Sequence, residues 1–246
     1  MRIDIVTLFP EMFEGPLRVS ILGRARERGL VNVILVNIRD FATDKHRVTD
    51  DAPFGGGPGM VLKPEPVFAA VESLKEVNSL ENVVLLSPQG RQFNQEIAGD
   101  LASKKDMVLV CGRYEGVDER IRLALVTDEI SIGDYVLSGG EIPALVIVEA
   151  VSRLIPGVIG NESSLRRDSF CRARLGSPQY TRPQSFRGMT VPEILLSGDH
   201  KMIEQWRLKE AFKRTLRRRP ELVRREALAT REIAILEQAK AELDAE

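Results

Sequence analysis

Three glycine-containing turns follow one another in the middle of the chain, and each comes directly after an apolar run. They occupy residues 85–90 (LLSPQG), 111–116 (CGRYEG) and 132–141 (IGDYVLSGGE). Ligands of α/β proteins bind at the carboxyl ends of the strands, and glycine there lets bare backbone approach a ligand. Each turn alone is compatible with a tight connection from strand to helix. The three together, with Gln89, Tyr114 and Tyr135, favour a binding crevice walled by main chain.

Apolar runs alternate with helical patterns from residue 2 to residue 154, which predicts an α/β fold with a parallel sheet covered on both faces. The run 31–38 alternates little, so we expect it to be buried on both faces. The expected strands are 2–8, 31–38, 82–86, 107–111 and 128–132; the expected helices are 19–28, 65–75, 94–101, 118–125 and 141–154.

The pattern changes in the last third of the chain. Residues 156–183 hold Gly, Ser, Pro and Arg without a clear period, which is typical of a linker or a mobile loop. Helical patterns return at 199–218, 220–225 and 230–243. We therefore expect an α/β domain over 1–160, a flexible linker over 161–176 and a helical domain over 177–246.

Composition excludes several classes of protein. With 43% hydrophobic and 29% charged residues in 246, the chain has the make-up of a soluble protein with a core. Its two cysteines and two histidines are too few for a disulfide framework or a zinc site. No segment has the length of a membrane span, and residues 1–4 lack the apolar stretch of a signal peptide. We expect a cytoplasmic protein with no membrane partner.

The usual nucleotide fingerprints, Walker A and G-x-G-x-x-G, do not occur. A basic segment does: between residues 207 and 225 nine residues are Lys or Arg and two are acidic, although the net charge of the chain is −1. A solvated helical face is one interpretation. A phosphate-binding surface is favoured, because Arg217, Arg218 and Arg219 place positive charge too close together for simple ion pairing.

Two further features have alternative interpretations. Arg153, at the end of the helix 141–154, and Asp168, in the irregular segment, are each compatible with a solvated charge. An acidic residue on a mobile segment is also a natural general base once ordering brings it to a substrate. The charged residues 44–51 and the glycine-rich residues 52–59 are a surface loop or a flexible cover over the crevice.

Six stretches of the chain together resemble one family. They are 4–13 (DIVTLFPEMF), 51–60 (DAPFGGGPGM), 112–118 (GRYEGVD), 132–141 (IGDYVLSGGE), 152–158 (SRLIPGV) and 180–183 (YTRP). The chain is similar, nearly end to end, to the bacterial tRNA (guanine-N1)-methyltransferases, the TrmD family of the SPOUT superfamily. The resemblance implies a SPOUT-type parallel sheet with a deep trefoil knot and a small all-helical C-terminal domain. It also implies a homodimer with the active site at the interface.

The resemblance further implies methylation of N1 of guanosine 37 in tRNA, next to the anticodon, with S-adenosylmethionine as methyl donor. Asp168 corresponds to the general base and Arg153 to the arginine that stabilises charge on guanine O6. Glu115 would steady Arg153 or recruit Mg²⁺. The anticodon stem would lie on Arg214, Arg217, Arg218 and Arg219. The implied donor contacts are Leu86, Ser87, Pro88, Gly112, Tyr114, Glu115, Ile132, Gly133, Asp134, Tyr135, Val136, Leu137, Gly139 and Gly140.

Two alternative functions are compatible with the sequence. One is a dehydrogenase with an unusual nucleotide loop. The other is a non-catalytic RNA-binding regulator on the same fold, which the presence of both Asp168 and Arg153 disfavours.

Overall fold

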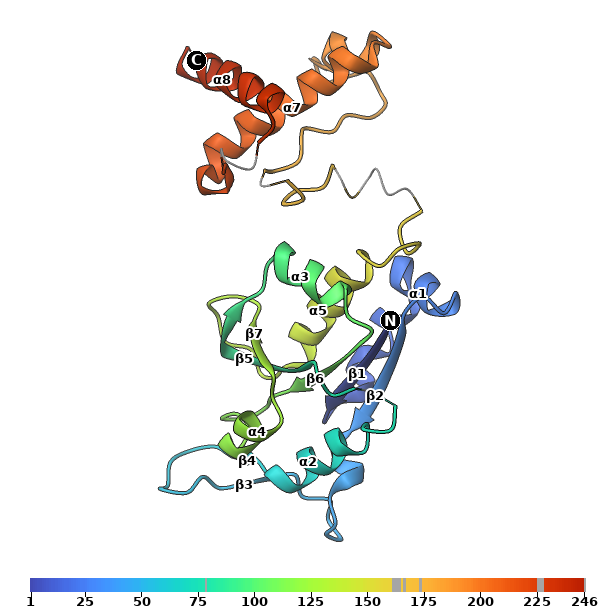
Figure 1. Ribbon diagram of the computed structural model, residues 1–246, viewed down its shortest axis with the longest axis vertical. Helices are drawn as coiled ribbons and strands as arrows, with labels where there is room; N and C mark the ends of the chain where they lie inside the picture. The colour runs from blue at the N-terminus through green and yellow to red at the C-terminus, as the bar shows by residue number, and fades with distance from the viewer. Residues whose placement is uncertain (78, 161–164, 166, 173, 225–227, 246) are drawn as a thin grey trace. The chain divides into compact units, whose positions relative to one another are not determined.

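The computed structural model of the chain describes residues 1–77, 79–160, 165, 167–172, 174–224 and 228–245 (Figure 1). The chain divides into two compact units, Met1–Gly160 and Asn161–Glu246. The first unit ends at the residue where the sequence places the end of its α/β domain. The expected linker, 161–176, falls partly outside the described residues, so its flexibility stays a prediction.

Five parallel strands form the sheet of the first unit, in the order β2-β1-β6-β5-β7. This confirms the predicted parallel sheet. Successive strand residues point to opposite faces, so within β6 Leu109 packs in one apolar cluster and Val108 in the other. The strands are β1 (Arg2–Thr7), β2 (Asn32–Asn37), β5 (Val83–Gln92), β6 (Asp106–Cys111) and β7 (Asp128–Ser131).

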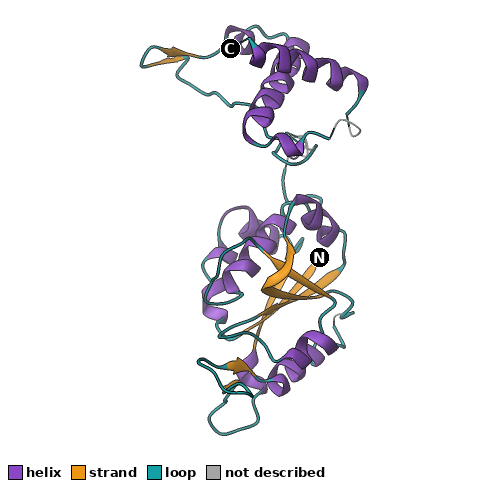
Figure 2. Ribbon diagram, turned by 90° about the vertical axis from the view of Figure 1, so that its left-hand side faces the viewer, coloured by secondary structure: helices purple, strands orange, loops and turns teal. Residues whose placement is uncertain are grey.

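Helices cover both faces of the sheet (Figure 2). On one face pack α1 (Ser20–Glu27), α3 (Gln95–Ala102) and α5 (Glu141–Ser152); on the other pack α2 (Pro64–Glu72) and α4 (Glu119–Ala124). Local chemistry starts several of these helices. The side chain of Asn94 accepts a hydrogen bond from the Ile97 amide at 3.0 Å, which caps α3, and Pro64 opens α2 with its fixed φ.

The prediction that residues 31–38 are buried on both faces is wrong. The strand β2 lies at the edge of the sheet, pairs only with β1, and is mostly half-buried. An edge strand has a neighbour on one side only, so a largely apolar run can stay partly open. Strand β5 is also longer than expected, for a reason that concerns the site.

The second unit is mainly helical. Helix α7 (His200–Arg218) begins after Asp199, whose carboxylate accepts from the Lys201 and Met202 amides at 3.0 Å. It packs on α8 (Thr230–Asp244) around Phe212 and Leu236. Two short 3₁₀ helices, Glu193–Leu196 and Pro220–Leu222, flank α7.

An antiparallel pair, β8 (Ser185–Phe186) and β9 (Met189–Thr190), was not expected from the sequence. The expected helix 220–225 is limited, in the part that is described, to the turn at Pro220–Leu222. Of the helices described in either unit, none combines the length and apolarity needed to cross a bilayer.

Candidate functional site

The three glycine turns lie after Leu86 of β5 and at the carboxyl ends of β6 and β7, and they enclose a cavity of about 360 Å³. This is the edge at which open α/β sheets bind ligands, and the volume lies in the range of small-molecule sites. Every expected donor contact except Asp134 lines the cavity. Residues that the sequence did not single out line it as well, among them Arg113, Glu119, Arg122, Ser131 and Pro143.

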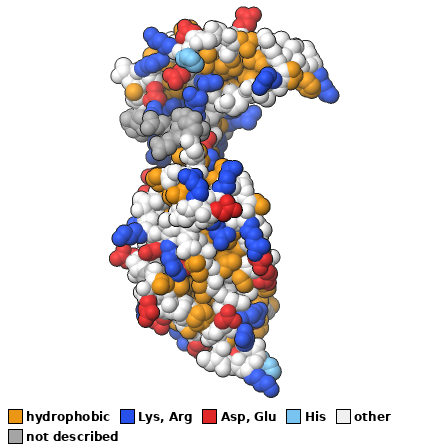
Figure 3. Space-filling model, turned by 90° about the vertical axis from the view of Figure 1, so that its right-hand side faces the viewer, with side chains coloured by type: hydrophobic (Ala, Val, Ile, Leu, Met, Phe, Trp, Pro, Cys, Tyr) orange, Lys and Arg blue, Asp and Glu red, His pale blue; other side chains and the backbone are white. Residues whose placement is uncertain are grey.

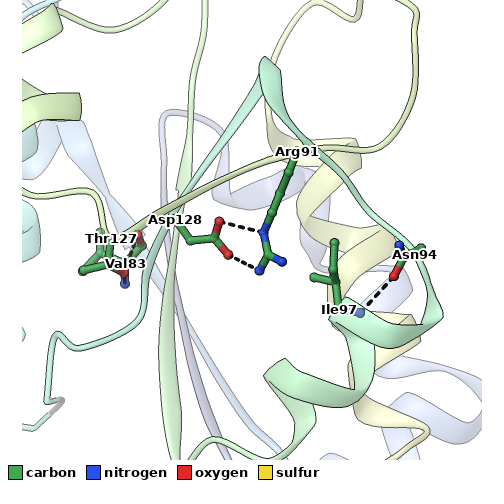
Figure 4. A network of polar contacts seen from close by, with 6 residues as sticks. All are labelled: Val83, Arg91, Asn94, Ile97, Thr127 and Asp128. Atoms are coloured by element: carbon green, nitrogen blue, oxygen red, sulfur yellow. Dashed lines mark hydrogen bonds and ion pairs between the residues drawn. The ribbon is translucent and has the colours of Figure 1, made fainter.

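The first turn is an excursion out of strand β5. Leu86 and Arg91 both pair with Ile130 of β7, so the four residues between them leave the ladder. The strand resumes at Arg91, whose guanidinium faces the carboxylate of Asp128 with nitrogen–oxygen distances of 3.0 and 2.7 Å (Figure 4). The sequence predicted that this strand ends at residue 86, because Pro88 and Gly90 interrupt the apolar run.

The second turn is bonded to the glycine-rich loop. Strands β3 (Asp50–Asp51) and β4 (Val61–Leu62) pair antiparallel and form the base of the loop 52–60. The Glu115 amide donates to Met60 O at 2.9 Å, and the Leu62 amide donates to Gly116 O at 3.0 Å. These two hydrogen bonds connect the base of the loop to the cavity wall. That the loop covers the crevice stays a prediction.

The third turn folds back onto the second. The Gly140 amide donates to Gly112 O at 2.8 Å. A Cβ at Gly140 would lie 2.6 Å from the Cα of Cys111, although its φ of −80° would suit any residue. Close packing of the third turn on the end of β6 therefore requires this glycine. The sequence had suggested ligand approach as the reason.

Gly140→Ala should lower the free energy of unfolding by about 1–3 kcal/mol, because the methyl group forces backbone apart in a packed region. Gly99 is the matched control: it lies on the exposed side of α3 with nothing within 4 Å of a Cβ. Gly99→Ala should raise the same free energy by about 0.5–1 kcal/mol. Urea unfolding of both variants measures the contrast, and equal effects would refute the packing argument.

Cys111 lies at the end of β6, behind the cavity wall, and is buried. Burial raises the pKa of its thiol, and the nearby Glu141 carboxylate raises the pKa further. The thiol therefore stays protonated at neutral pH. Because the thiolate is the reactive form of cysteine, Cys111 is not a nucleophile for covalent catalysis.

Comparison with known proteins decides the family. The model of the tRNA (Guanine-1)-methyltransferase family TrmD matches residues 1–225. The chain belongs to the TrmD family. It is 57% identical over 243 residues to the tRNA (guanine-N(1)-)-methyltransferase of Dictyoglomus turgidum. The aligned residues make up 99% of this chain and 98% of that protein.

Two other relatives carry the same name. The Moorella thermoacetica protein is 57% identical over 240 residues, 97% of this chain and 96% of its own length. The Staphylococcus epidermidis protein is 54% identical over 243 residues, 99% of each chain.

Arg153, one of the two expected catalytic residues of this TrmD family member, does not line the cavity. Arg153 caps the C-terminal end of α5 and is half-buried. Asp168 belongs to the second unit, where it is exposed and its amide donates to Leu165 O at 3.2 Å. Helix α5 begins beside Gly140 at the cavity and runs for 12 residues, which is about 18 Å from end to end, and Arg153 follows its far end. The helix is longer than an arginine side chain.

The four expected tRNA contacts of the TrmD family member differ in their surroundings. Arg214 is half-buried and donates to Gly176 O at 3.1 Å, which ties residue 176 to α7. Arg219 forms an ion pair with Glu221, so the argument that these charges are too concentrated to pair is wrong for Arg219. Arg217 and Arg218 are exposed at the end of α7.

The acidic cavity residues do not form a metal cage. Within the described ranges no three His, Cys, Asp or Glu side chains come together as a metal site would require. Glu115 lines the cavity, but a carboxylate by itself supplies few of the six oxygen ligands that Mg²⁺ takes, the rest being waters or substrate.

Proposed function

We propose that this chain transfers the methyl group of S-adenosylmethionine to N1 of guanosine 37 in tRNA, in the cytoplasm. The observation that carries the proposal is the cavity that the three glycine turns enclose, in a chain that belongs to the TrmD family. Its wall combines main chain at five glycines with apolar side chains such as Leu86 and Val136. Such a lining fits a ligand with a flat base, a ribose and a polar amino-acid end.

Label transfer tests this activity directly. The protein is incubated with S-adenosylmethionine tritiated in the methyl group and an unmodified tRNA transcript with guanosine at position 37. The label should enter the RNA, and nuclease digestion should place it on N1 of that guanosine. A transcript with adenosine at position 37 is the control. tRNA binding without label transfer would favour the RNA-binding regulator; nicotinamide reduction instead would favour the dehydrogenase.

A deep trefoil knot through the cavity region is part of the proposal. It is supported by the family, and by the way the chain returns after β7 so that Gly140 bonds to Gly112. A knot holds crossing segments together without a disulfide. Knotted chains are rare, so we infer the knot from the family and not from the pattern of apolar and polar residues.

The chemistry requires a proton to leave guanine. At neutral pH, N1 carries a proton and its lone pair is delocalised in the ring, so it is a poor nucleophile. Bound S-adenosylmethionine supplies an electrophilic methyl group on a positively charged sulfur. Asp168 accepts the N1 proton as the N1–carbon bond forms and the carbon–sulfur bond breaks, with its electron pair remaining on sulfur. Arg153 donates to guanine O6, where negative charge develops. No step is assigned to Mg²⁺.

A homodimer with a shared active site is part of the proposal. Because Arg153 lies about 18 Å along α5 from the cavity of its own chain, we propose that it serves the cavity of a second copy. The outer face of α5 supports this: Ile142 and Val146, one turn apart, are 46% and 40% exposed, and Val136 beside them in sequence is 86% exposed. Apolar side chains exposed in this way are typical of an interface. A monomeric mass in sedimentation equilibrium would contradict it.

The basic end of α7 is proposed to hold the anticodon stem. The second unit presents Lys and Arg among hydrophobic side chains on one face (Figure 3). Replacing both Arg217 and Arg218 by Ala should raise the tRNA KM and lower the slope of log K against log salt by about 2, one unit for each phosphate contact. The matched control replaces Lys104 and Lys105, which are exposed beside the amino-terminal end of β6. If both pairs of substitutions act alike, the basic segment is only a solvated face.

A further inference from the structure

A carboxylate is buried directly behind the cavity wall. Glu141, the first residue of α5, is 1% exposed, and it does not line the cavity. Its carboxylate accepts a hydrogen bond from Thr7 Oγ1 at 2.9 Å and pairs with Arg113 Nη1 at 3.2 Å. A buried charge is costly unless it is paired and hydrogen-bonded. The position of Glu141 therefore depends on these two partners.

Arg113 connects this buried carboxylate to the second turn. It lines the cavity, and its guanidinium lies over the ring of Phe9, 4.4 Å from the centroid. It has a β-bridge to Gly139 in the third turn. The side chain thus lies between the ring of Phe9, two residues after β1, and a carboxylate from α5, and the residue is part of the cavity wall.

The third turn also closes on this ion pair. A Cβ at Gly139 would contact the carboxylate of Glu141 and would lie 2.8 Å from Arg113 Nη1. The charged pair therefore fills the space behind Gly139 and leaves no room for a side chain there. One buried contact set joins the end of β1, the second turn, the third turn and the start of α5.

We infer that Glu141 and Arg113 are positioning residues that fix the second and third turns at the spacing needed to bind the methyl donor. The inference rests on the proposed function, because it names residues that shape the donor cavity. Loss of the Glu141 charge leaves the Arg113 guanidinium without its buried partner. The guanidinium then turns toward water, and the second turn moves with it. Glu141 is not in the cavity wall, so its effect on the ligand passes through Arg113 and Gly139.

The test is calorimetric binding of S-adenosylmethionine to the protein without tRNA. Glu141→Gln keeps the shape of the side chain and should weaken donor binding by about tenfold or more, since small displacements of positioning groups have effects of that size or larger. Asp4→Asn is the matched control. It removes the charge from another buried carboxylate on the same sheet, which is paired with Arg2, and neither residue lines the cavity or adjoins one of its turns. It should change donor affinity less than twofold.

Two more measurements separate positioning from general stability. Affinity for tRNA, measured by filter binding, should be the same in Glu141→Gln as in the unsubstituted protein. The double variant Glu141→Gln, Arg113→Gln should bind the donor no more weakly than the worse single variant, since the two residues act as one pair. Additive losses would overturn the inference.

The outcomes distinguish this inference from the proposed function. If the unsubstituted protein does not bind S-adenosylmethionine, the proposed function fails. If it binds and Glu141→Gln binds equally well, the function stands and the positioning inference is wrong. Should Glu141→Gln not fold, Arg113→Lys decides: lysine keeps the charge but lacks the planar fork, so it should also weaken binding, and unchanged affinity would overturn the inference.

Discussion

Asp168→Ala should slow methyl transfer by about 10²- to 10⁴-fold, the usual contribution of a general base, while S-adenosylmethionine binds as before. The proton of guanine N1 then has no acceptor, whereas the cavity wall, which residues of the first unit form, is unchanged. Single-turnover rates and calorimetric donor binding measure the two effects. Asp244→Ala, which removes an exposed carboxylate at the end of α8, is the control and should leave both unchanged.

The pH dependence of Asp168→Ala provides a second, independent measurement. Raising the pH should partly restore its rate, because hydroxide in solution then removes the N1 proton. A variant that is slow because it has lost its structure gains nothing from a higher pH. A full rate for Asp168→Ala at neutral pH would remove Asp168 from the role of base.

Arg153→Ala should slow methyl transfer by about 10²- to 10³-fold, comparable with the loss of one donor to a developing oxyanion. Arg153→Lys should recover part of this rate, since it keeps the charge but offers a single ammonium group. Arg24→Ala, which removes an exposed arginine from α1, is the control and should leave the rate of methyl transfer unchanged. Affinity for the methyl donor should be unchanged in all three variants.

Mixed dimers test whether Arg153 acts on the partner's cavity. Two differently tagged chains are co-expressed, one with Arg153→Ala and the other with Gly140→Ala, after the homodimer of each variant has been found inactive, and the mixed dimer is purified through both tags. If Arg153 acts across the interface, the intact cavity of the first chain meets the intact Arg153 of the second, and activity returns. If Arg153 acts within its own chain, the mixed dimer stays inactive.

Local patterns predicted the sheet and the cavity well. Apolar runs and glycine turns are read from neighbouring residues, and in a parallel sheet the carboxyl ends of all strands meet at one edge. Three turns spread over residues 85–140 could therefore be assigned to one cavity without knowing any contact. The order of the strands could not be predicted in the same way, which is why residues 31–38 were expected to be buried on both faces, whereas β2 lies at the edge of the sheet and is mostly half-buried.

Contacts between residues far apart in the chain could not be predicted from the sequence. Thr7 and Glu141 are 134 positions apart, and nothing in either neighbourhood indicates that they bond. The ion pair of Arg219 with Glu221 is local, two residues apart, and was still not predicted. The many basic residues around Arg219 favoured unpaired charges. The need for glycine at position 140 depends on Cys111, a residue of another strand. Side-chain geometry settles such contacts, and residue type alone does not.

The glycine-lined wall of the cavity has a consequence for inhibitors. A compound that hydrogen-bonds to the backbone of Gly112, Gly133 or Gly140 uses atoms that every amino acid carries, so no change of side chain removes them. The substitutions that could block it sterically must add a Cβ, and at Gly140 that atom would collide with the backbone of β6. Resistance at this wall would therefore damage the protein, and we expect escape substitutions to arise instead at exposed rim residues such as Tyr114 and Val136.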